Sequence, residues 1–250
     1  MVKLEIVSGR NPVKEAMAGN RPVKELYVGD YVESSFQNEM ALLAKASDVP
    51  MKLVSKTRLH DLAGTAHHQG IVAKVAGFPY CSMADILGRS GQKGEKPFII
   101  ILDHLQDPQN FGAILRTADA CGAHGVVIPK RRSVDVNETV VKASSGAAEH
   151  VLVSKVPNLR QVVMELKKQW IWVIGAELSG QGPFYETDLT VPVALVLGSE
   201  GEGLSPLIQR ECDILVNIPM GGRVNSLNVS VASALMMYEV YRQRDMAIGS

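Results

Sequence analysis

The sequence predicts an α/β protein in which a parallel β-sheet is covered by helices on both faces and is preceded by a smaller α/β domain. Two observations lead to this fold class. After residue 97, almost continuous apolar runs of strand length alternate with amphipathic helical stretches, which is typical of buried parallel strands. Before residue 79, shorter strand-like and helical runs alternate over a length that suffices for a small domain.

Residues 1–78 are expected to form the smaller domain. Its strands are predicted over residues 26–28, 51–54 and 71–75, and its helices over residues 12–17 and 33–46. Residues 79–96 are expected to form a linker, because the stretch 82–96 is polar, rich in glycine and without hydrophobic periodicity.

Residues 97–250 are expected to form the larger domain around the parallel sheet. Its strands are predicted over residues 98–102, 125–129, 170–174, 193–197 and 214–218. Ligands of open parallel sheets bind beyond the carboxyl ends of the strands. Three motifs of this sequence begin at such ends, so we expect a ligand site there.

Composition and charge exclude several classes of protein. An apolar content of 46% excludes general disorder, and a formal net charge of zero argues against a protein that coats nucleic acid indiscriminately. A basic run at residues 130–132 is either an RNA contact or a solvated loop. The three cysteines have no metal-type spacing, so we expect no metal site and a reducing compartment. No segment has the length and apolarity of a membrane span or signal peptide, so we expect a cytoplasmic protein.

The first motif, residues 102–119, combines a strand end with a helix. The predicted buried stripe of this helix consists of residues at helical spacing: Phe111, Ile114, Leu115 and Ala118. Arg116 lies roughly 140° away from this stripe at about 100° per residue, and Asn110 lies in the first turn. Arg116 is therefore either a substrate-binding cation or a solvated surface side chain.

The second motif, residues 198–203, follows a buried strand and contains glycines and two carboxylates. It lacks the glycine spacing of dinucleotide-binding loops and of P-loops. Glu200 and Glu202 would repel a phosphate and suit an uncharged or cationic ligand. The alternatives are a turn with incidental acidic residues and the phosphate loop of a nucleotide-binding enzyme.

The third motif, residues 218–230, lies between a strand and a long amphipathic helix. Its two glycines permit positive φ angles and close approach of a ligand. Asn225, Ser226 and Asn228 are residue types that cap helices, although the motif could also be only a cap after a tight turn. The following helix carries an apolar stripe that is expected to be core or a dimer seam: Leu227, Val231, Ala234, Leu235 and Tyr238.

In this order, the three motifs resemble those of the SpoU (TrmH-type) family of SPOUT methyltransferases, over residues 98–244. The resemblance implies methyl transfer from S-adenosyl-L-methionine to the ribose 2′-hydroxyl of RNA, a homodimer and a C-terminal trefoil knot. It implies catalytic roles for Asn110, Arg116, Glu200, Ser226 and Asn228. It implies cofactor contacts for Leu197, Gly198, Gly201, Ile218, Met220 and Leu227.

Arg116 matches the family arginine that is proposed to activate the ribose hydroxyl. Arginine is a poor base, because the pKa of a guanidinium is above about 12. Positioning of a substrate phosphate is therefore the other role that we consider for Arg116.

The N-terminal domain resembles the L30e-like substrate-binding domain of many SpoU enzymes, on the basis of residues 8–13 and 67–73. The layout is similar to that of the bacterial enzymes that methylate a guanosine of 23S rRNA, so we expect this activity. Methylation of a tRNA guanosine and a non-catalytic RNA-binding role are the alternatives. DNA is not an expected partner, because the 2′-hydroxyl distinguishes RNA from DNA, and neither is a membrane.

Overall fold

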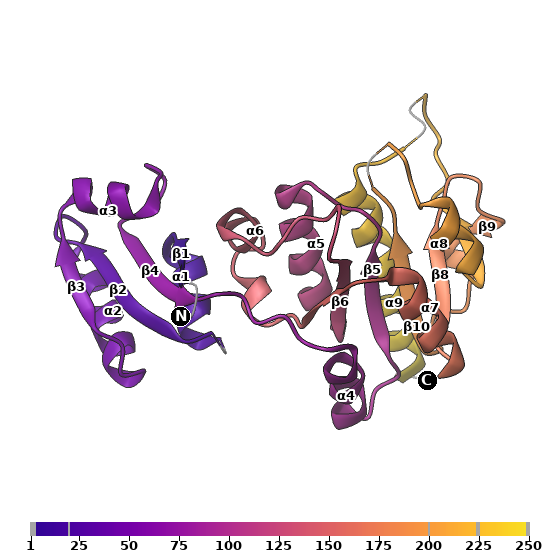
Figure 1. Cartoon of the computed structure of the whole chain (residues 1–250), viewed down its shortest axis with the longest axis horizontal. Helices are drawn as coiled ribbons and strands as arrows, with labels where there is room; N and C mark the ends of the chain where they lie inside the picture. Colours follow the sequence, from indigo (N-terminus) through magenta and orange to yellow (C-terminus); the bar gives the residue numbers. More distant parts are fainter. Residues whose placement is uncertain (1–3, 20, 200, 224–225, 249–250) are drawn as a thin grey trace. The chain divides into compact units, whose positions relative to one another are not determined.

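The chain folds into two compact units, each of which combines residues from separate parts of the sequence (Figure 1). The computed structural model describes residues 4–19, 21–199, 201–223 and 226–248. The first unit contains Met1–Pro79 and Asp135–His150, and the second contains Tyr80–Val134 and Val151–Ser250.

The first unit is built on a mixed sheet flanked by helices. Its elements before residue 80 are β1 (Leu4–Ser8), α1 (Arg10–Ala18), β2 (Val23–Gly29), α2 (Ser34–Ala46), β3 (Met51–Val54), α3 (Lys56–Ala63) and β4 (Ile71–Ala76). The strand order is β1-β4-β2-β3; β4 is antiparallel to β1 and β2, and β2 is parallel to β3. The predicted strands and helices of this unit are confirmed, whereas β1 and α3 were not predicted.

A segment from the C-terminal half of the sequence completes the first unit. It forms α6 (Glu138–Ala143) and the 3-10 turn η1 (Ala147–Glu149). Ser8 Oγ donates a hydrogen bond of 2.7 Å to Glu138 Oε1. The guanidinium of Arg21 lies 3.1 Å from Glu149 Oε1, and both side chains are buried. The predicted boundaries placed this segment with residues 97–250, because polar pairs between distant residues leave no periodic signal in a sequence.

The second unit is built on a parallel sheet. Its strands are β5 (Phe98–Leu102), β6 (Gly125–Pro129), β7 (Val153–Val156), β8 (Trp172–Ala176), β9 (Gly182–Pro183), β10 (Val193–Leu197) and β11 (Ile214–Asn217). The strand order is β7-β6-β5-β10-β8-β11-β9, and every strand pair in the described part of this sheet is parallel. The predicted parallel α/β class is confirmed. The third predicted strand begins two residues late, at Trp172, and the short strands β7 and β9 were not predicted.

The expected linker over residues 79–96 contains a helix that was not predicted, α4 (Met83–Lys93). Ser82 and Asp85 form a reciprocal capping box at its start, and Gly94 ends it in a left-handed conformation. The buried side chain of Ile86 packs against Gly125, where a Cβ atom would lie 2.6 Å from it. The helix is therefore fixed by its caps and by the packing of Ile86, Met83 and Leu87 against the core, although its glycines weaken the sequence signal.

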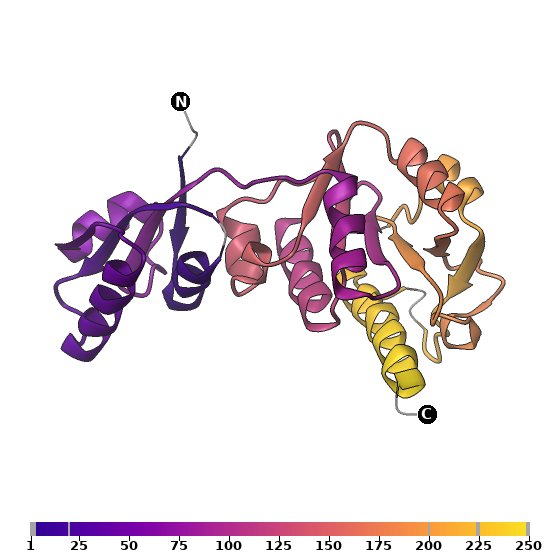
Figure 2. The same ribbon diagram turned by 90° about the horizontal axis from the view of Figure 1, so that it is seen from below.

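Helices cover both faces of the parallel sheet. On one face α4, α7 (Leu159–Lys168) and α8 (Pro206–Glu211) pack their apolar side chains against alternate strand residues. On the other face α5 (Pro108–Ala120) and α9 (Val229–Ile248) lie side by side (Figure 2). The predicted buried stripe of α5 is confirmed, because Phe111, Ile114, Leu115 and Ala118 are all buried.

Helix α9 buries a different face from the predicted one. Its buried residues are Val229, Ser233, Met236, Met237, Glu239 and Val240. By contrast, Val231, Leu235 and Tyr238 are 48%, 42% and 52% exposed. The predicted stripe therefore does not cover the sheet of its own chain. None of the helices in the described ranges combines the length and the apolarity that crossing a membrane requires.

Candidate active site

The three sequence motifs converge at the carboxyl ends of the central strands. The first follows β5, the second follows β10 and the third follows β11. β5 pairs with β10, and β8 lies between β10 and β11, so these strand ends share one edge of the sheet. We predicted a ligand site at this edge because ligands of open parallel sheets bind beyond the carboxyl ends of the strands.

A cavity of about 470 Å³ opens at this edge. Residues with predicted cofactor contacts line it: Leu197, Gly198, Gly201, Ile218, Met220 and Leu227. Ser226 and Asn228, two of the predicted catalytic residues, also line it. The structure thus brings eight of the eleven predicted site residues to one cavity.

The loop after β10 is closed on itself and requires its glycines. Ser199 and Gly203 exchange two backbone hydrogen bonds of 3.1 Å. A Cβ atom on Gly198 would lie 2.1 Å from the carbonyl carbon of Gly203, so this position accepts only glycine. Gly201 and Gly203 have positive φ angles of 86° and 67°. Glu200, a predicted catalytic residue on this loop, lies outside the described residues.

Two carboxylates that sequence reasoning missed hold this loop in place. Glu177 Oε2 accepts a hydrogen bond of 3.3 Å from the backbone nitrogen of Leu204. The buried Asp103 accepts one of 2.8 Å from the nitrogen of Ser205 through Oδ2. Each residue directly follows a buried strand, β8 or β5, so the rule of strand ends could have identified both.

Asn110 and Asn228 connect the first and third motifs. Asn228 Nδ2 donates a hydrogen bond of 3.0 Å to Asn110 Oδ1. Asp107 caps α5 by accepting a hydrogen bond of 2.7 Å from the backbone nitrogen of Asn110. Asn228 Oδ1 accepts a hydrogen bond of 2.8 Å from the nitrogen of Ser230, at the start of α9. The amide of Asn228 is therefore held at the start of α9 and contacts the amide of Asn110 in the first turn of α5.

Arg116 lies on the exposed surface of α5 and does not line the cavity. It belongs to the same helix as Asn110, which contacts the cavity residue Asn228. The basic run 130–132 is also exposed and directly follows β6, the neighbour of β5. These cations therefore lie outside the cavity.

The cavity is apolar and anionic. Glu177 and Glu202 line it together with apolar side chains such as Leu178 and Val216, and no cationic side chain is among its described lining residues. Such a lining repels phosphates and suits a ligand with an apolar part and a positive charge. The combination fits S-adenosyl-L-methionine, which has an adenine, an ammonium and a sulfonium.

The cysteines contribute no reactive thiolate or metal site within the described chain. Burial raises the pKa of the Cys81 and Cys121 thiols to about 11 and that of Cys212 to about 12. Among the described residues, no group of three histidine, cysteine or acidic side chains could hold a metal ion.

Comparisons with known proteins agree with these features. Residues 97–238 match the SpoU rRNA Methylase family, and residues 6–81 match a domain described as RNA 2′-O ribose methyltransferase substrate binding. The chain is 43% identical over 241 residues to YacO of Bacillus subtilis, which is assigned to the TrmH family of tRNA/rRNA methyltransferases. This match covers 96% of each chain.

Solved structures share the fold. The SpoU methyltransferase AviRb from Streptomyces viridochromogenes, in complex with the cofactor AdoMet, matches with a TM-score of 0.81 and 26% identity. This match covers 97% of this chain and 91% of AviRb. The A. aeolicus TrmH/SpoU tRNA modifying enzyme is 34% identical with a TM-score of 0.56, over 61% of this chain and 78% of its own. The resemblance drawn from the three motifs is thereby confirmed: the chain belongs to the SpoU (TrmH) family of RNA 2′-O-ribose methyltransferases.

Proposed function

We propose that this protein methylates the ribose 2′-hydroxyl of a guanosine in 23S rRNA, with S-adenosyl-L-methionine as the methyl donor. The observation that supports it most is the anionic cavity of about 470 Å³ beside the contact between Asn110 and Asn228. A ligand bound there lies next to fixed polar side chains from two helix starts, as the transfer of a group between two bound molecules requires.

The cofactor is proposed to bind through the residues that line this cavity. Leu197, Ile218, Met220 and Leu227 provide apolar contacts for an adenine ring. The carboxylates of Glu177 and Glu202 favour the positive charges of the methionine part. S-Adenosyl-L-methionine supplies an activated methyl group when bound.

The catalytic residues are proposed to position the RNA rather than to act as strong acids or bases. Asn110, Ser226 and Asn228 would orient the ribose hydroxyl next to the cavity, and Arg116 would bind a neighbouring phosphate. Arg116 is suited to this role because its guanidinium keeps its charge and offers bidentate donors. Glu200 is proposed to organise this site, which remains a prediction from the resemblance.

A ribosomal RNA is the preferred substrate in this proposal, and tRNA is the alternative. The family model that matches residues 97–238 is described as an rRNA methylase, which supports this preference. The first unit contains the matched substrate-binding domain, residues 6–81, and is proposed to bind the RNA substrate. The cytoplasm is the proposed location of this reaction.

We also propose that the second units of two chains form a homodimer through α9. An apolar groove of about 630 Å³ runs along this helix, and its lining includes Phe184, Val231, Leu235, Tyr238 and Tyr241. Apolar surface of this kind is buried by a self-complementary contact in a two-fold dimer. Leu235→Glu should convert the dimer into a monomer in sedimentation equilibrium, whereas Leu207→Glu, an exposed leucine outside the groove, should not.

The function is tested with purified protein, radiolabelled S-adenosyl-L-methionine and transcripts of 23S rRNA or tRNA, followed by mapping of 2′-O-methyl groups. The proposal expects transfer to a guanosine of 23S rRNA. Methyl transfer to tRNA alone would indicate that tRNA is the substrate instead. Binding of RNA without methyl transfer would indicate a non-catalytic RNA-binding protein. Binding of nucleoside phosphates in the cavity would indicate a nucleotide-dependent enzyme.

A further inference from the structure

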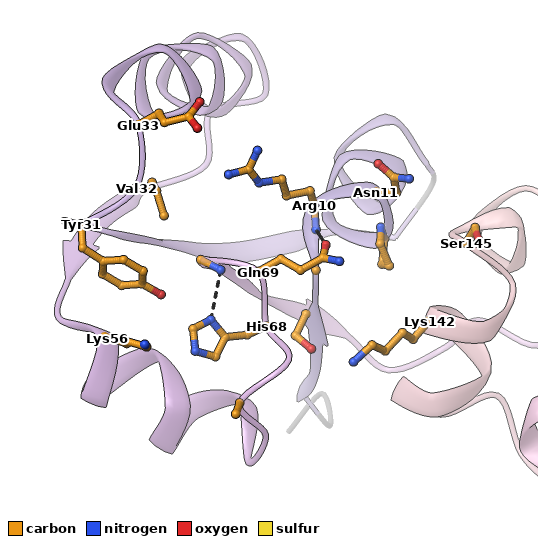
Figure 3. Close-up of a pocket in the computed structure, with 15 residues that line it drawn as sticks. Arg10, Asn11, Tyr31, Val32, Glu33, Lys56, His68, Gln69, Lys142 and Ser145 are labelled. Carbon is orange, nitrogen blue, oxygen red and sulfur yellow. Dashed lines mark hydrogen bonds between the residues drawn. The ribbon is translucent and has the colours of Figure 1, made fainter.

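A second cavity lies within the first unit, far along the sequence from the three motifs. It has a volume of about 810 Å³, a size that accommodates a nucleotide. Figure 3 shows the segments that surround it: residues 8–12 where β1 passes into α1, residues 31–33 after β2, and residues 66–70 before β4. Lys142 and Ser145, from the segment that α6 begins, complete its lining.

The loops around this cavity are tied to one another. Gln69 Oε1 accepts a hydrogen bond of 2.8 Å from the backbone nitrogen of Arg10, and Gly29 donates one of 2.9 Å to the carbonyl of Gly70. Gln69 has a φ of 54°, unusual for a residue with a side chain. A Cβ atom on Gly70 would lie 2.3 Å from Val32 Cγ1. The cavity therefore has a fixed shape, held by close contacts and a strained backbone.

Positive charge gathers around this cavity. Arg10, Lys56 and Lys142 line it from α1, α3 and α6, and Glu33 is the one acidic side chain among the described lining residues. Figure 3 shows Lys56 and Lys142 extending toward the cavity from opposite sides, whereas the guanidinium of Arg10 lies on the side of Glu33. The guanidinium of Arg10 lies 4.2 Å from the centroid of the Phe36 ring, which fixes its direction. Lys56 and Lys142 are exposed, so their charges are available to a ligand.

An aromatic ring and a neutral donor accompany these cations. Tyr31 is 47% exposed, and its ring packs over Gly29, where a Cβ atom would lie 2.6 Å from Cε1. His68 is buried, and its Nδ1 accepts a hydrogen bond of 3.1 Å from the nitrogen of Gly70. This bond places the imidazole proton on Nε2, which has no hydrogen-bond acceptor within the described part of the chain. Burial also lowers the pKa of His68, which favours the neutral ring.

We propose that this cavity binds one unstacked nucleotide of the RNA substrate, with its base against Tyr31 and its adjacent phosphates on Arg10, Lys56 and Lys142. Stacking of unpaired bases on aromatic side chains and cation contacts to phosphates are the usual means by which proteins bind single-stranded RNA. This inference rests on the proposed function, in which the first unit binds RNA. It adds that the segment 135–150, outside the matched substrate-binding domain, contributes a phosphate contact.

The inference is tested with two fluorescein-labelled RNAs, a stem–loop with an unpaired loop and a fully paired duplex of the same length. Fluorescence anisotropy gives their affinities at several salt concentrations. Tyr31→Ala should weaken stem–loop binding about 5- to 150-fold, the effect of one lost stacking contact, without changing the salt dependence. Tyr31→Phe keeps the ring and should bind like the wild-type protein.

Lys142→Ala should lower the slope of log affinity against log salt by about 0.7–0.9, the effect of one phosphate contact. Lys45→Ala is the matched control, because Lys45 is an exposed lysine of the same unit that does not line the cavity. Affinity for the duplex should be affected equally by Lys142→Ala and Lys45→Ala.

The inference is overturned if Tyr31→Ala and Lys142→Ala both bind the stem–loop as Lys45→Ala does. Circular dichroism checks the fold of each variant, and if Tyr31→Ala is unfolded, the exposed Lys142→Ala decides the outcome. Methyl transfer by the wild-type protein is measured in parallel. If the wild-type protein transfers methyl groups normally and the variants keep their affinity for the stem–loop, only the nucleotide site is rejected. If the wild-type protein transfers no methyl group to any RNA, the proposed function itself is rejected.

Discussion

The cavity of the second unit is lined by Glu177, Glu202 and apolar side chains, whereas the cavity of the first unit is lined by Arg10, Lys56 and Lys142. A formal net charge of zero conceals this opposition, because it is a sum over the whole chain. An anionic cavity excludes phosphates and admits a cationic cofactor, and a cationic cavity attracts the RNA backbone. Under the proposed function, the difference in charge would direct the cofactor to one cavity and the RNA to the other before any specific contact forms.

The largest effect is expected from the ion pair that fixes the segment bearing Lys142. Arg21→Met leaves Glu149 buried without its cation, which should lower the free energy of unfolding by about 3–5 kcal/mol. Glu149 Oε2 has no hydrogen-bond partner among the described residues, so no other group compensates. Urea denaturation measures this loss, and Arg21→Met combined with Glu149→Leu should recover part of it.

The same variant has an expected pH dependence. Burial raises the pKa of Glu149, and Arg21 opposes this shift. A raised pKa means that protonation of Glu149 favours the folded state, and this contribution is lost as pH rises. The destabilisation by Arg21→Met should therefore be smaller at about pH 5 than at about pH 7.5. An equal loss at both values would show that the charge of Glu149 is not its cause.

The second-largest effect is expected from Arg116, a cation of the second unit that lies outside the anionic cavity. Arg116→Ala should lower the single-turnover rate of methyl transfer about 100-fold, as expected when a substrate is misplaced near the reacting atoms. The affinity for S-adenosyl-L-methionine, measured by calorimetry, should stay within about twofold, because Arg116 does not line the cavity. Arg116→Lys keeps the charge without the bidentate donors and should recover part of the rate. A fall in cofactor affinity as large as the fall in rate would contradict the proposal that Arg116 binds the RNA and not the cofactor.

In the wild-type protein, the affinity for RNA should depend more strongly on salt concentration than the affinity for S-adenosyl-L-methionine. If the three cations of the first unit and Arg116 contact phosphates, RNA affinity should fall about 50- to 150-fold between 50 and 200 mM salt. The affinity for S-adenosyl-L-methionine should change about twofold or less over the same range, since no release of condensed counterions accompanies its binding. If the affinities for RNA and for S-adenosyl-L-methionine depended equally on salt, the proposed difference in charge between the two binding sites would be contradicted.

The smallest effect is expected from one carboxylate at the cofactor cavity. Glu202 is exposed, so its attraction to a nearby positive charge is about 1 kcal/mol in water. Glu202→Gln should therefore weaken S-adenosyl-L-methionine binding about fivefold. Binding of S-adenosylhomocysteine, which lacks the sulfonium charge, should change less. Glu186→Gln, which removes an exposed carboxylate outside the cavity, should affect neither ligand.

The parts that sequence reasoning predicted are those with a local signal. Strands such as β5 and β10 are buried on both faces, so their apolar runs show in the sequence. The residues with predicted cofactor contacts came from the resemblance to the SpoU family, and the structure places them around one cavity at the ends of the central strands. Asn110 and Asn228 were both predicted, although 118 positions separate them, and the structure joins them by a hydrogen bond.

The parts that were missed depend on partners distant in sequence. β9 has two residues and exists only through its pairing with β11. α4 contains Gly88 and Gly91, which obscure its helical period, and its start depends on the capping box of Ser82. The assignment of residues 135–150 to the first unit rests on pairs such as Arg21 with Glu149, which no local pattern reveals.

The buried pair of Arg21 and Glu149 also has a consequence for synthesis of the chain on the ribosome. The sheet of the first unit emerges early, but Glu149 follows Pro79 by roughly 70 residues, a delay of about 4–14 s at 5–20 residues per second. During this delay the nascent sheet exposes the cation that Glu149 later covers, while β5 and β6 are already leaving the tunnel. Folding of the first unit is therefore completed only after synthesis of the second unit has begun, and strict domain-by-domain folding does not apply to this chain.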